Sequence, residues 1–137
     1  MKVLLGFLAG LVLALGSLSV SSKVQAQSQD SFCDDLVYQE TSFLSSGELT
    51  KVRGEAEKLQ NATASEVRVR VFVSANGAHI EDFVKQIESK CRSWRGPEGQ
   101  TKNNLIAILI TTEGHDFLIW TGAGWEKALP DSKLAKI

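Results

Sequence analysis

Two glycines, Gly122 and Gly124, follow directly on an apolar run and raise the question of phosphate binding. A dinucleotide-binding loop needs a third glycine three positions further on, between the first strand of the unit and its helix. Lys127 occupies that position, and the apolar run before Gly122 has the pattern of the second strand of a hairpin. A Walker phosphate loop requires Gly-Lys-Ser/Thr, which does not occur in the chain. The sequence therefore predicts that no nucleotide is bound.

Few side chains could act as a nucleophile or a base. His79 and His115 are the only histidines, and their separation places them on different elements, at a helix start and in a turn. No serine has the sequence context of a hydrolase nucleophile elbow. Cys91 lies on the apolar stripe of a predicted helix, which directs its thiol toward the core. These patterns disfavour a covalent hydrolase, and the sequence assigns no catalytic residue.

Residues 1–26 have the pattern of a secretory signal peptide. Lys2 provides a positive start, residues 3–20 form an almost unbroken apolar run, and Val24-Gln25-Ala26 supplies small residues for cleavage. The alternative is an uncleaved N-terminal anchor, because the apolar run is close to the length that spans a bilayer.

The charge of the remaining chain argues against a nucleic-acid partner. Without Lys2 and Lys23, the chain carries 13 basic and 16 acidic residues, a net charge of −3. Nucleic-acid binding depends on clustered basic residues, which this balance does not favour. Residues 27–36 form an N-terminal lead that is polar as far as about Asp30, and the domain itself is predicted to occupy residues 37–137.

Cys33 and Cys91 are the only cysteines of the chain. An even number of cysteines in a protein that leaves the cytoplasm favours a disulfide, which would tie the start of the domain to its body. The alternative is two separate thiols, with Cys91 packed as a small apolar residue. Neither cysteine has a His or a further Cys nearby at metal-ligand spacing, so a zinc site is not expected.

The first regular element is predicted to be a helix that starts after Ser45 and ends near Asn61. Ser45 and Glu48 have the spacing of a capping box, in which each residue caps the backbone of the other. Apolar residues then recur at helical spacing and predict one buried stripe. The stripe consists of Leu49, Val52, Ala56 and Leu59.

The stretch EVRVRVFVSA predicts a strand, because its valines alternate with other residues at period two. Arg68 and Arg70 fall on the opposite face from the valines. One interpretation of this pair is an anion site. The favoured interpretation is the solvated face of a strand near the edge of the sheet.

A second helix and two more strands are predicted to follow. Apolar residues from Ile80 to Trp94 recur at helical spacing, and Leu105–Ile110 is apolar throughout, as in a central strand covered on both faces. Residues 112–115 predict a tight turn in which Gly114 can adopt a positive φ. Residues 116–120 then return as the hairpin partner.

The predicted fold class is α/β. A parallel β-α-β unit with a right-handed helical crossover and an antiparallel hairpin strand form a small mixed sheet packed with helices. Asp131 can cap one more helix, with Leu134 and Ile137 on its apolar face, but the chain stops too soon for that helix to be stable. The domain is therefore predicted to be truncated at its C-terminus.

The three tryptophans divide into two groups. Trp94 ends an apolar stripe and Trp120 lies in a strand, so both are predicted to pack in the core. Trp125 lies beside two glycines and is predicted to be exposed. It is the candidate contact for a partner protein.

Five motifs in a fixed order resemble the TPM domain family: FLS, EVRVRVFV, SWRG, NNLIAILI and TGAGWEKALPD. That family is named for a thylakoid lumen protein, a photosystem II accessory protein and a nematode levamisole-receptor modulator. The likeness covers Val37–Ile137. It implies an extracytoplasmic domain linked to the assembly, repair or modulation of membrane-protein complexes. Weak acid phosphatase activity and divalent cation binding are attributed to some members.

The chain departs from the family pattern at two acidic positions. Gln39 stands where the opening pattern has its aspartate, and Asn103-Asn104-Leu105 stands where many members have Asp-Asn-Gly. An amide lacks the charge that Ca²⁺ or Mg²⁺ prefers. The resemblance therefore implies that a metal site would depend on Asp116, Glu126 or Asp131. A turn, a solvated surface and a helix cap explain these three acids more simply.

Two hypotheses of function result from the resemblance and the signal segment. The first is an extracytoplasmic domain, secreted, periplasmic or lumenal, that binds and supports a membrane-protein complex. The second is a divalent-cation-dependent acid phosphatase of low activity. Many family members continue into a transmembrane helix and a glycine-rich tail, so the resemblance also allows membrane anchoring through a segment after Ile137.

Overall fold

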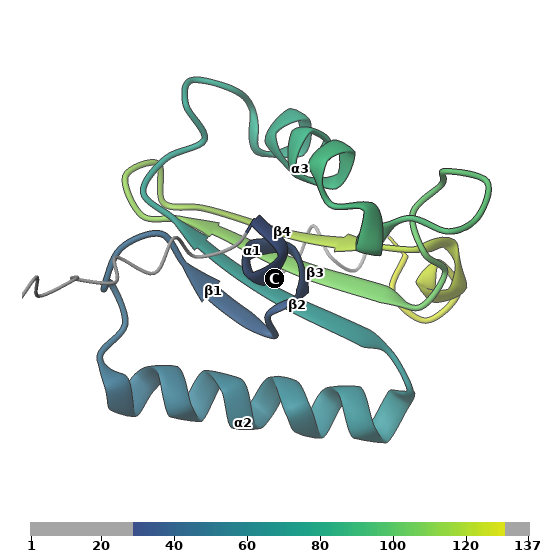
Figure 1. Ribbon diagram of the computed structural model, residues 1–137, viewed down its shortest axis with the longest axis horizontal. Helices are drawn as coiled ribbons and strands as arrows, with labels where there is room; N and C mark the ends of the chain where they lie inside the picture. Colours follow the sequence, from purple (N-terminus) through teal and green to yellow (C-terminus); the bar gives the residue numbers. More distant parts are fainter. Residues whose placement is uncertain (1–28, 131–137) are drawn as a thin grey trace, which may run out of the picture.

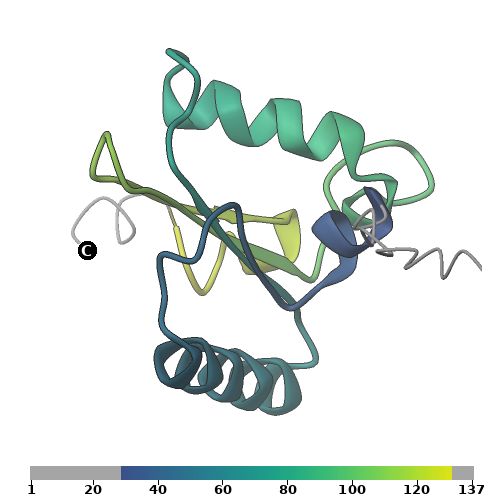
Figure 2. The same ribbon diagram turned by 60° about the vertical axis from the view of Figure 1, so that its left-hand side comes forward.

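A four-stranded mixed sheet with helices on both faces forms the described part of the chain (Figures 1 and 2). The computed structural model describes residues 29–130, so the predicted signal peptide and Asp131 lie outside it. The elements are α1 (Gln29–Asp34), β1 (Val37–Gln39), α2 (Ser46–Thr63), β2 (Glu66–Phe72), α3 (Ile80–Lys90), η1 (Arg92–Trp94), β3 (Leu105–Thr111), β4 (Asp116–Thr121) and η2 (Ala123–Trp125).

The strands lie side by side in the order β1-β2-β3-β4. The first three are parallel, and β4 is antiparallel to β3. The predicted α/β class is therefore confirmed, with its parallel pair, crossover helix and hairpin strand. The sheet has one further parallel strand, β1, which is only three residues long. So short a segment shows no period-two pattern that sequence analysis could detect.

The start of α2 has the predicted capping box. The Ser45 Oγ accepts a hydrogen bond from the Glu48 backbone N–H at 3.4 Å, and the Glu48 carboxylate accepts one from the Ser45 backbone N–H at 2.9 Å. The hydrogen bonds from the Ser45 side chain and then its backbone lower the pKa of Glu48. The helix ends at Thr63, two residues later than predicted. Its Ala56 packs with Val67 and Val69 of β2.

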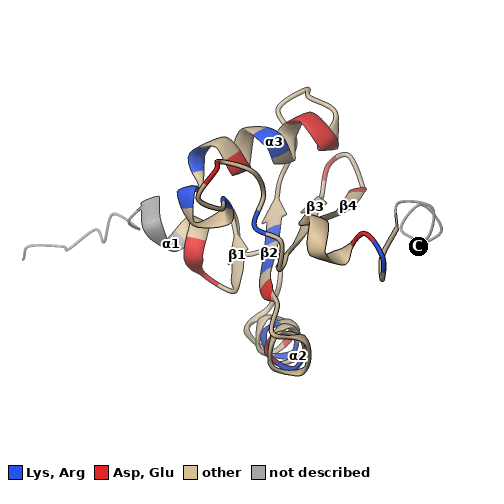
Figure 3. Ribbon diagram, turned by 90° about the vertical axis from the view of Figure 1, so that its right-hand side faces the viewer, with Lys and Arg blue, Asp and Glu red and all other residues tan. Residues whose placement is uncertain are grey.

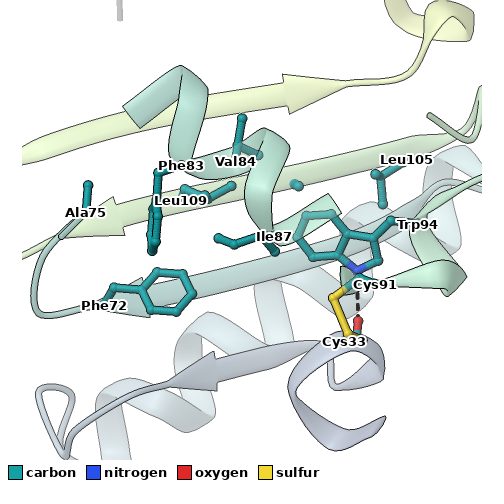
Figure 4. Packing of buried hydrophobic residues seen from close by; sticks show 11 residues of the cluster. Cys33, Phe72, Ala75, Phe83, Val84, Ile87, Cys91, Trp94, Leu105 and Leu109 are labelled. Carbon is teal, nitrogen blue, oxygen red and sulfur yellow. Dashed lines mark hydrogen bonds between the residues drawn. A yellow bond between two sulfur atoms is a disulfide. The ribbon is translucent and has the colours of Figure 1, made fainter. Parts of the chain in front are cut away.

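The larger core lies on the other face of the sheet, between the strands and α3 (Figure 4). Trp94 is fully buried there, as predicted, and Trp120 is partly buried against the same cluster. The alternate residues of β3 that face α3 are Leu105, Ala107 and Leu109, and all three are buried. Both faces of β3 contribute buried side chains, which confirms the prediction of a strand covered on both sides.

The predicted disulfide is present. Cys33 and Cys91 are bonded, with their Cα atoms 5.3 Å apart. The bond joins α1 to the C-terminal end of α3 across the edge of the core, where Figure 4 shows both cysteines beside Trp94. The Trp94 Nε1 also donates a hydrogen bond to the Cys33 carbonyl at 2.9 Å. The segment before β1 is therefore fixed to the body of the domain by a covalent bond and by the indole.

The prediction that Arg68 and Arg70 form a solvated strand face is wrong. The strand β2 lies between β1 and β3, and Arg70 is 0% exposed. In Figure 3 the basic stretch of β2 lies inside the molecule, between the layers of α2 and α3. Arg68 keeps 13% of its side chain exposed and pairs with Glu66. The prediction failed because α1 and η1 cover this face.

The guanidinium of Arg70 is enclosed by carbonyl oxygens and aromatic rings. Its Nη1 donates to the Asp35 and Val69 carbonyls, and its Nη2 donates to the Cys33 carbonyl, each at 2.8 Å. The rings of Phe32 and Trp94 lie 5.8 and 5.4 Å from the guanidinium carbon. Burial first, and then the Arg68 charge, lower the pKa of Arg70 to about 9. The group therefore stays positive at neutral pH, held by hydrogen bonds and cation–π contacts.

The prediction that Gly114 has a positive φ in the β3–β4 turn is wrong. The residue with a left-handed φ is His115, at 54°, and Gly114 does not have a positive φ. A Cβ at Gly114 would meet the Asp116 carboxylate, which is the end of an exposed side chain that can move aside. His79 and His115 are exposed, at the N-cap of α3 and in the turn, as predicted.

Gly122 allows a close backbone approach after β4. Its N–H donates to the Leu105 carbonyl at 3.0 Å, and a Cβ at this position would lie 1.8 Å from the Lys102 carbonyl oxygen. Lys102 cannot easily move away, because its own N–H donates to the Trp94 carbonyl and its Nζ pairs with Glu66 at 2.8 Å. The first glycine of the Gly-x-Gly pair thus closes one end of the sheet against a fixed loop.

We expect Gly122→Ala to lower the free energy of unfolding by about 2–3 kcal/mol, because the added methyl group forces the two backbone segments apart. Urea unfolding measures the change. Gly54→Ala is the matched control, since no atom lies within 4 Å of its added methyl group. That helical substitution should stabilise the protein by about 0.5–1 kcal/mol. Equal effects of the two variants would contradict the close approach at Gly122.

Candidate functional site

The carboxyl ends of the parallel strands β1, β2 and β3 lie together at one end of the sheet (Figure 1). The chain leaves β1 toward α2 on one face and leaves β2 toward α3 on the other face. In open α/β sheets, connections that diverge in this way leave a crevice outside the carboxyl ends of the strands, and ligands bind there. This end of the sheet is therefore the candidate functional site, and two clefts occur along it.

The loop between β1 and α2 is held by hydrogen bonds at both ends. The Gln39 side chain accepts from the Leu44 N–H at 2.9 Å and donates to the Leu44 carbonyl at 3.5 Å. Glu40 donates its N–H to the Val71 carbonyl and accepts from the Val73 N–H with its carboxylate, both at 2.9 Å. The loop thus has a defined shape and is attached to β2.

The amide of Gln39 has a structural role at the position where the resembling family has an aspartate. An amide can accept from one backbone group and donate to another, whereas an ionised carboxylate only accepts. The Gln39 side chain uses both abilities on Leu44. Where the family has a negatively charged aspartate, this chain therefore has an amide whose two hydrogen bonds hold the loop in place.

Phe43 is presented to solvent by this loop. It is 60% exposed, the largest value among the large apolar side chains of residues 29–130. Its N–H donates to the Thr41 carbonyl at 2.7 Å, so the backbone turns tightly just before it. Thr41 and Ser42 line a cleft of about 380 Å³, which Asp35, Glu40 and Arg53 also line. An exposed aromatic side chain beside a polar cleft is typical of a contact for a partner protein.

Sequence reasoning did not identify Phe43. The sequence held only a weak signal, because Phe43 lies two positions before the cap of α2 and beside the apolar Leu44. A hydrophobic residue directly before the cap commonly packs against the first turn of the helix, and Leu44 has that position here. Whether Phe43 packs or projects depends on the path of the loop, which the Gln39 and Glu40 side chains determine.

The second cleft lies between the loop after β2 and the β3–β4 turn. It has a volume of about 420 Å³, and its lining includes His79, Glu113 and Asp116. The Asp116 carboxylate also accepts a hydrogen bond from the Thr111 Oγ1 at 3.2 Å. One of the three predicted metal ligands therefore belongs to the candidate site, together with an acid and a histidine that sequence reasoning had not grouped with it.

Glu126 lies at the other end of the sheet. Asp116 pairs with Thr111 at the start of β4, and Glu126 follows η2, which comes after the end of the same strand (Figure 1). Asp131, the third predicted ligand, is outside the described residues. Within residues 29–130, no group of three His, Cys, Asp or Glu side chains is arranged to hold a metal ion. The predicted metal site stays a prediction.

Trp125, the predicted partner contact, is partly buried in η2. Its carbonyl accepts from the Ala128 and Leu129 N–H groups at 2.9 and 2.7 Å. Its Nε1 is buried and has no hydrogen-bond acceptor among the described atoms. The indole is thus less available than Phe43, and its role as a contact stays a prediction.

Comparisons with known proteins give one result. A family model described as TPM domain, with the short name TPM_phosphatase, matches residues 37–137. The match begins at the first residue of β1 and includes α2, α3 and all four strands. No curated protein matches the chain.

Proposed function

Because this chain belongs to the TPM domain family, we propose that it is an extracytoplasmic domain that binds a membrane-protein complex and supports its assembly, repair or modulation. The observation that carries the proposal is the exposure of Phe43 on a loop clamped by Gln39 and Glu40. A binding surface that is already ordered loses little conformational entropy when its partner arrives.

The disulfide supports the extracytoplasmic location. Disulfides persist in oxidising compartments and are rare in proteins of the cytosol. Cys33 and Cys91 are both buried, and they are the only cysteines, so no free thiol remains. Among the helices between Gln29 and Pro130, none is long and apolar enough to cross a membrane.

We expect Phe43→Ala to weaken binding to the membrane-protein complex about thirtyfold or more, the effect of losing about 2 kcal/mol at a hot spot. The reason is that the ring is exposed in the free protein and would be buried in the complex. The measurement is capture of solubilised membrane proteins from the native cell by immobilised protein, followed by titration of the captured complex.

Phe117→Ala is the matched control, because Phe117 is also an exposed aromatic residue, at 48%, but lies on β4, the outer strand on the other side of the sheet from β1. It should bind as the parent protein does. Trp125→Ala in the same assay tests the contact predicted from sequence. Equal binding by the Phe43 and Phe117 variants would exclude the Phe43 surface, and failure of the parent protein to capture any membrane protein would reject the function.

The second candidate function is a divalent-cation-dependent acid phosphatase of low activity. The cleft that contains His79, Glu113 and Asp116 at the carboxyl ends of β2 and β3 favours it. Mg²⁺ is commonly held by one or two carboxylates together with substrate phosphate oxygens, so Asp116 with Glu113 would suffice. A bound Ca²⁺ or Mg²⁺ would neutralise charge on the phosphoryl oxygens, and the chain's own residues would hold it at the cleft.

For this function we expect Asp116→Asn to reduce cation-dependent hydrolysis of a phosphate ester at least tenfold, because the amide loses the charge that binds the cation. Glu126→Gln is the control, since Glu126 lies at the other end of β4 and should be silent. Calorimetry with Ca²⁺ and Mg²⁺ accompanies the assay. Absence of both heat and turnover in the parent protein would reject the phosphatase.

A further inference from the structure

The outer edge of β1 is unpaired within residues 29–130. β1 is the first strand in the order β1-β2-β3-β4, so a neighbouring strand lies on its inner side alone (Figure 1). On that side the Leu36 carbonyl and the Glu40 N–H form hydrogen bonds of 2.8 and 2.9 Å with backbone groups of β2. Backbone groups of alternate residues in a strand point to the same side. The groups of Val37 and Gln39 therefore point outward.

These outward backbone groups have the character of a docking edge. No hydrogen bond within the described chain reaches the N–H and C=O groups of Val37 and Gln39 on that side. Unpaired groups of this kind are a template for an added strand. Proteins commonly protect an edge strand with proline, lysine or an inward-pointing charge, and β1, with the sequence Val-Tyr-Gln, has none of these.

A cleft continues this edge beyond the three residues of β1. It has a volume of about 380 Å³, and its lining includes Asp35, the whole of β1 and the loop as far as Ser42. Leu49 and Arg53 of α2 form the facing wall. Side chains of a strand point alternately to its two faces. Every second side chain of a strand added to β1 would therefore enter this cleft.

The two faces beside the edge favour different side chains. Arg53 is exposed and forms no ion pair in the described chain, although Asp35 and Glu40 line the same cleft. A carboxylate is the partner that a guanidinium binds best. On the opposite face the rings of Phe32 and Tyr38 are partly buried, with their centroids 5.0 Å apart. An apolar side chain packs well against such rings.

We propose that β1 binds an extended segment of the membrane-protein partner as an added strand, with an acidic side chain of that segment on Arg53. The backbone of the segment pairs with Val37 and Gln39, and an apolar side chain lies beside Tyr38. This inference rests on the function proposed above, because the loop that carries Phe43 continues directly from β1. A second copy of the chain would add only another three-residue strand, which is too little surface for a stable dimer.

Amide hydrogen exchange of the free full chain tests whether the edge is open. The Val37 and Gln39 N–H groups should exchange at least about a hundredfold faster than the Tyr38 N–H, which points toward β2. Slow exchange at all three residues would show that the edge is already covered, and would overturn the inference whatever the protein binds. Protection that appears as the protein concentration rises would assign the edge to a second copy and overturn it as well.

Val37→Pro tests the backbone pairing. Proline removes one outward N–H and is tolerated at the free side of an edge strand. Val37→Ala is the matched variant, because it loses the side chain but keeps the N–H. We expect Val37→Pro to bind the solubilised complex captured by the parent protein at least about tenfold more weakly than Val37→Ala does. Thermal unfolding shows whether both variants are folded, and equal binding by two folded variants would exclude strand addition.

Arg53→Glu tests the same contact at an exposed side chain, where folding is not at risk. It should weaken binding of the captured complex at least about tenfold. Lys51→Glu is the matched control for charge, since Lys51 lines a different cleft with Ile108, and it should bind as the parent does. If Phe43→Ala weakens binding while Arg53→Glu does not, the added strand is rejected and the proposed function stands. If the parent captures no membrane protein, the proposed function fails and this inference fails with it.

Discussion

Replacement of Cys33 and Cys91 by serine is expected to lower the free energy of unfolding by about 4 kcal/mol. The disulfide joins residues 58 positions apart, so its loss releases a long loop in the unfolded chain. Domains of this size are stabilised by about 5–15 kcal/mol, so the loss is a large part of the total. Urea unfolding of the parent and the double variant measures it.

Reduction of the parent protein in denaturant, followed by refolding with reductant present, is the control. It removes the same cross-link without changing a side chain, so it should cost the same free energy. A double variant much less stable than the reduced parent would show that the serines disturb the core. A double variant as stable as the oxidised parent would contradict the role assigned to the bond.

Arg70→Ala is expected to lower the free energy of unfolding by about 3–5 kcal/mol. The substitution leaves the Asp35 carbonyl without its guanidinium donor and opens a space between Phe32 and Trp94. A buried carbonyl without a partner costs about 1–3 kcal/mol, and a large cavity costs a similar amount. Chemical unfolding at pH 7 gives the value.

Arg68→Ala is the matched control, two residues away on the same strand. Its side chain is 13% exposed, and one of its hydrogen bonds is to Glu66. We expect a loss of about 1 kcal/mol for this variant. Equal losses for Arg68→Ala and Arg70→Ala would show that burial of Arg70 has no special importance.

The pH dependence of the Arg70 effect can be stated from its pKa. The folded pKa of about 9 is well below the ordinary value of an arginine, so the unfolded state binds the proton more tightly above pH 9. Below pH 9 the group is protonated in both states, and its contribution is constant. The Arg70→Ala loss should therefore be the same at pH 6 and pH 8 and should change only above pH 9.

Arg70 and the disulfide act on the same residue. The guanidinium, the Trp94 indole and the Cys91 sulfur all bind Cys33. Contacts that share a partner are not additive. The three substitutions in one chain should therefore cost at least 1 kcal/mol less than the sum of the Arg70 loss and the disulfide loss. A sum that is simply additive would mean that the two constraints are independent.

Elements whose contacts are local were predictable from the sequence. The capping box of α2 joins Ser45 to a residue three positions away, and the α3 stripe depends on helical spacing. The apolar stretch of β3 and the turn after it predicted a central strand with a hairpin partner, and both are present. The disulfide was predicted from the even number of cysteines together with the predicted signal peptide, because disulfides persist in oxidising compartments.

The candidate site was only partly predictable. Asp116 was selected as one of three acids along the sequence, yet the fold places it with His79 and Glu113, from separate loops. Glu126 is ten residues away in the sequence, but β4 carries it to the other end of the sheet. The exposure of Phe43 depends on hydrogen bonds to the side chains of Gln39 and Glu40, and no residue pattern encodes that geometry.

The residue pattern establishes which side chains share a face of a helix or strand, whereas packing between distant segments establishes which of those faces are buried. Period two in β2 places Arg68 and Arg70 opposite the valines, but α1, from a polar segment some 40 residues earlier, covers Arg70. Likewise, Gly122 is required by the Lys102 backbone, which only the folded chain brings near. Periodicity reports the local geometry of one segment, whereas burial depends on contacts between segments far apart in the chain.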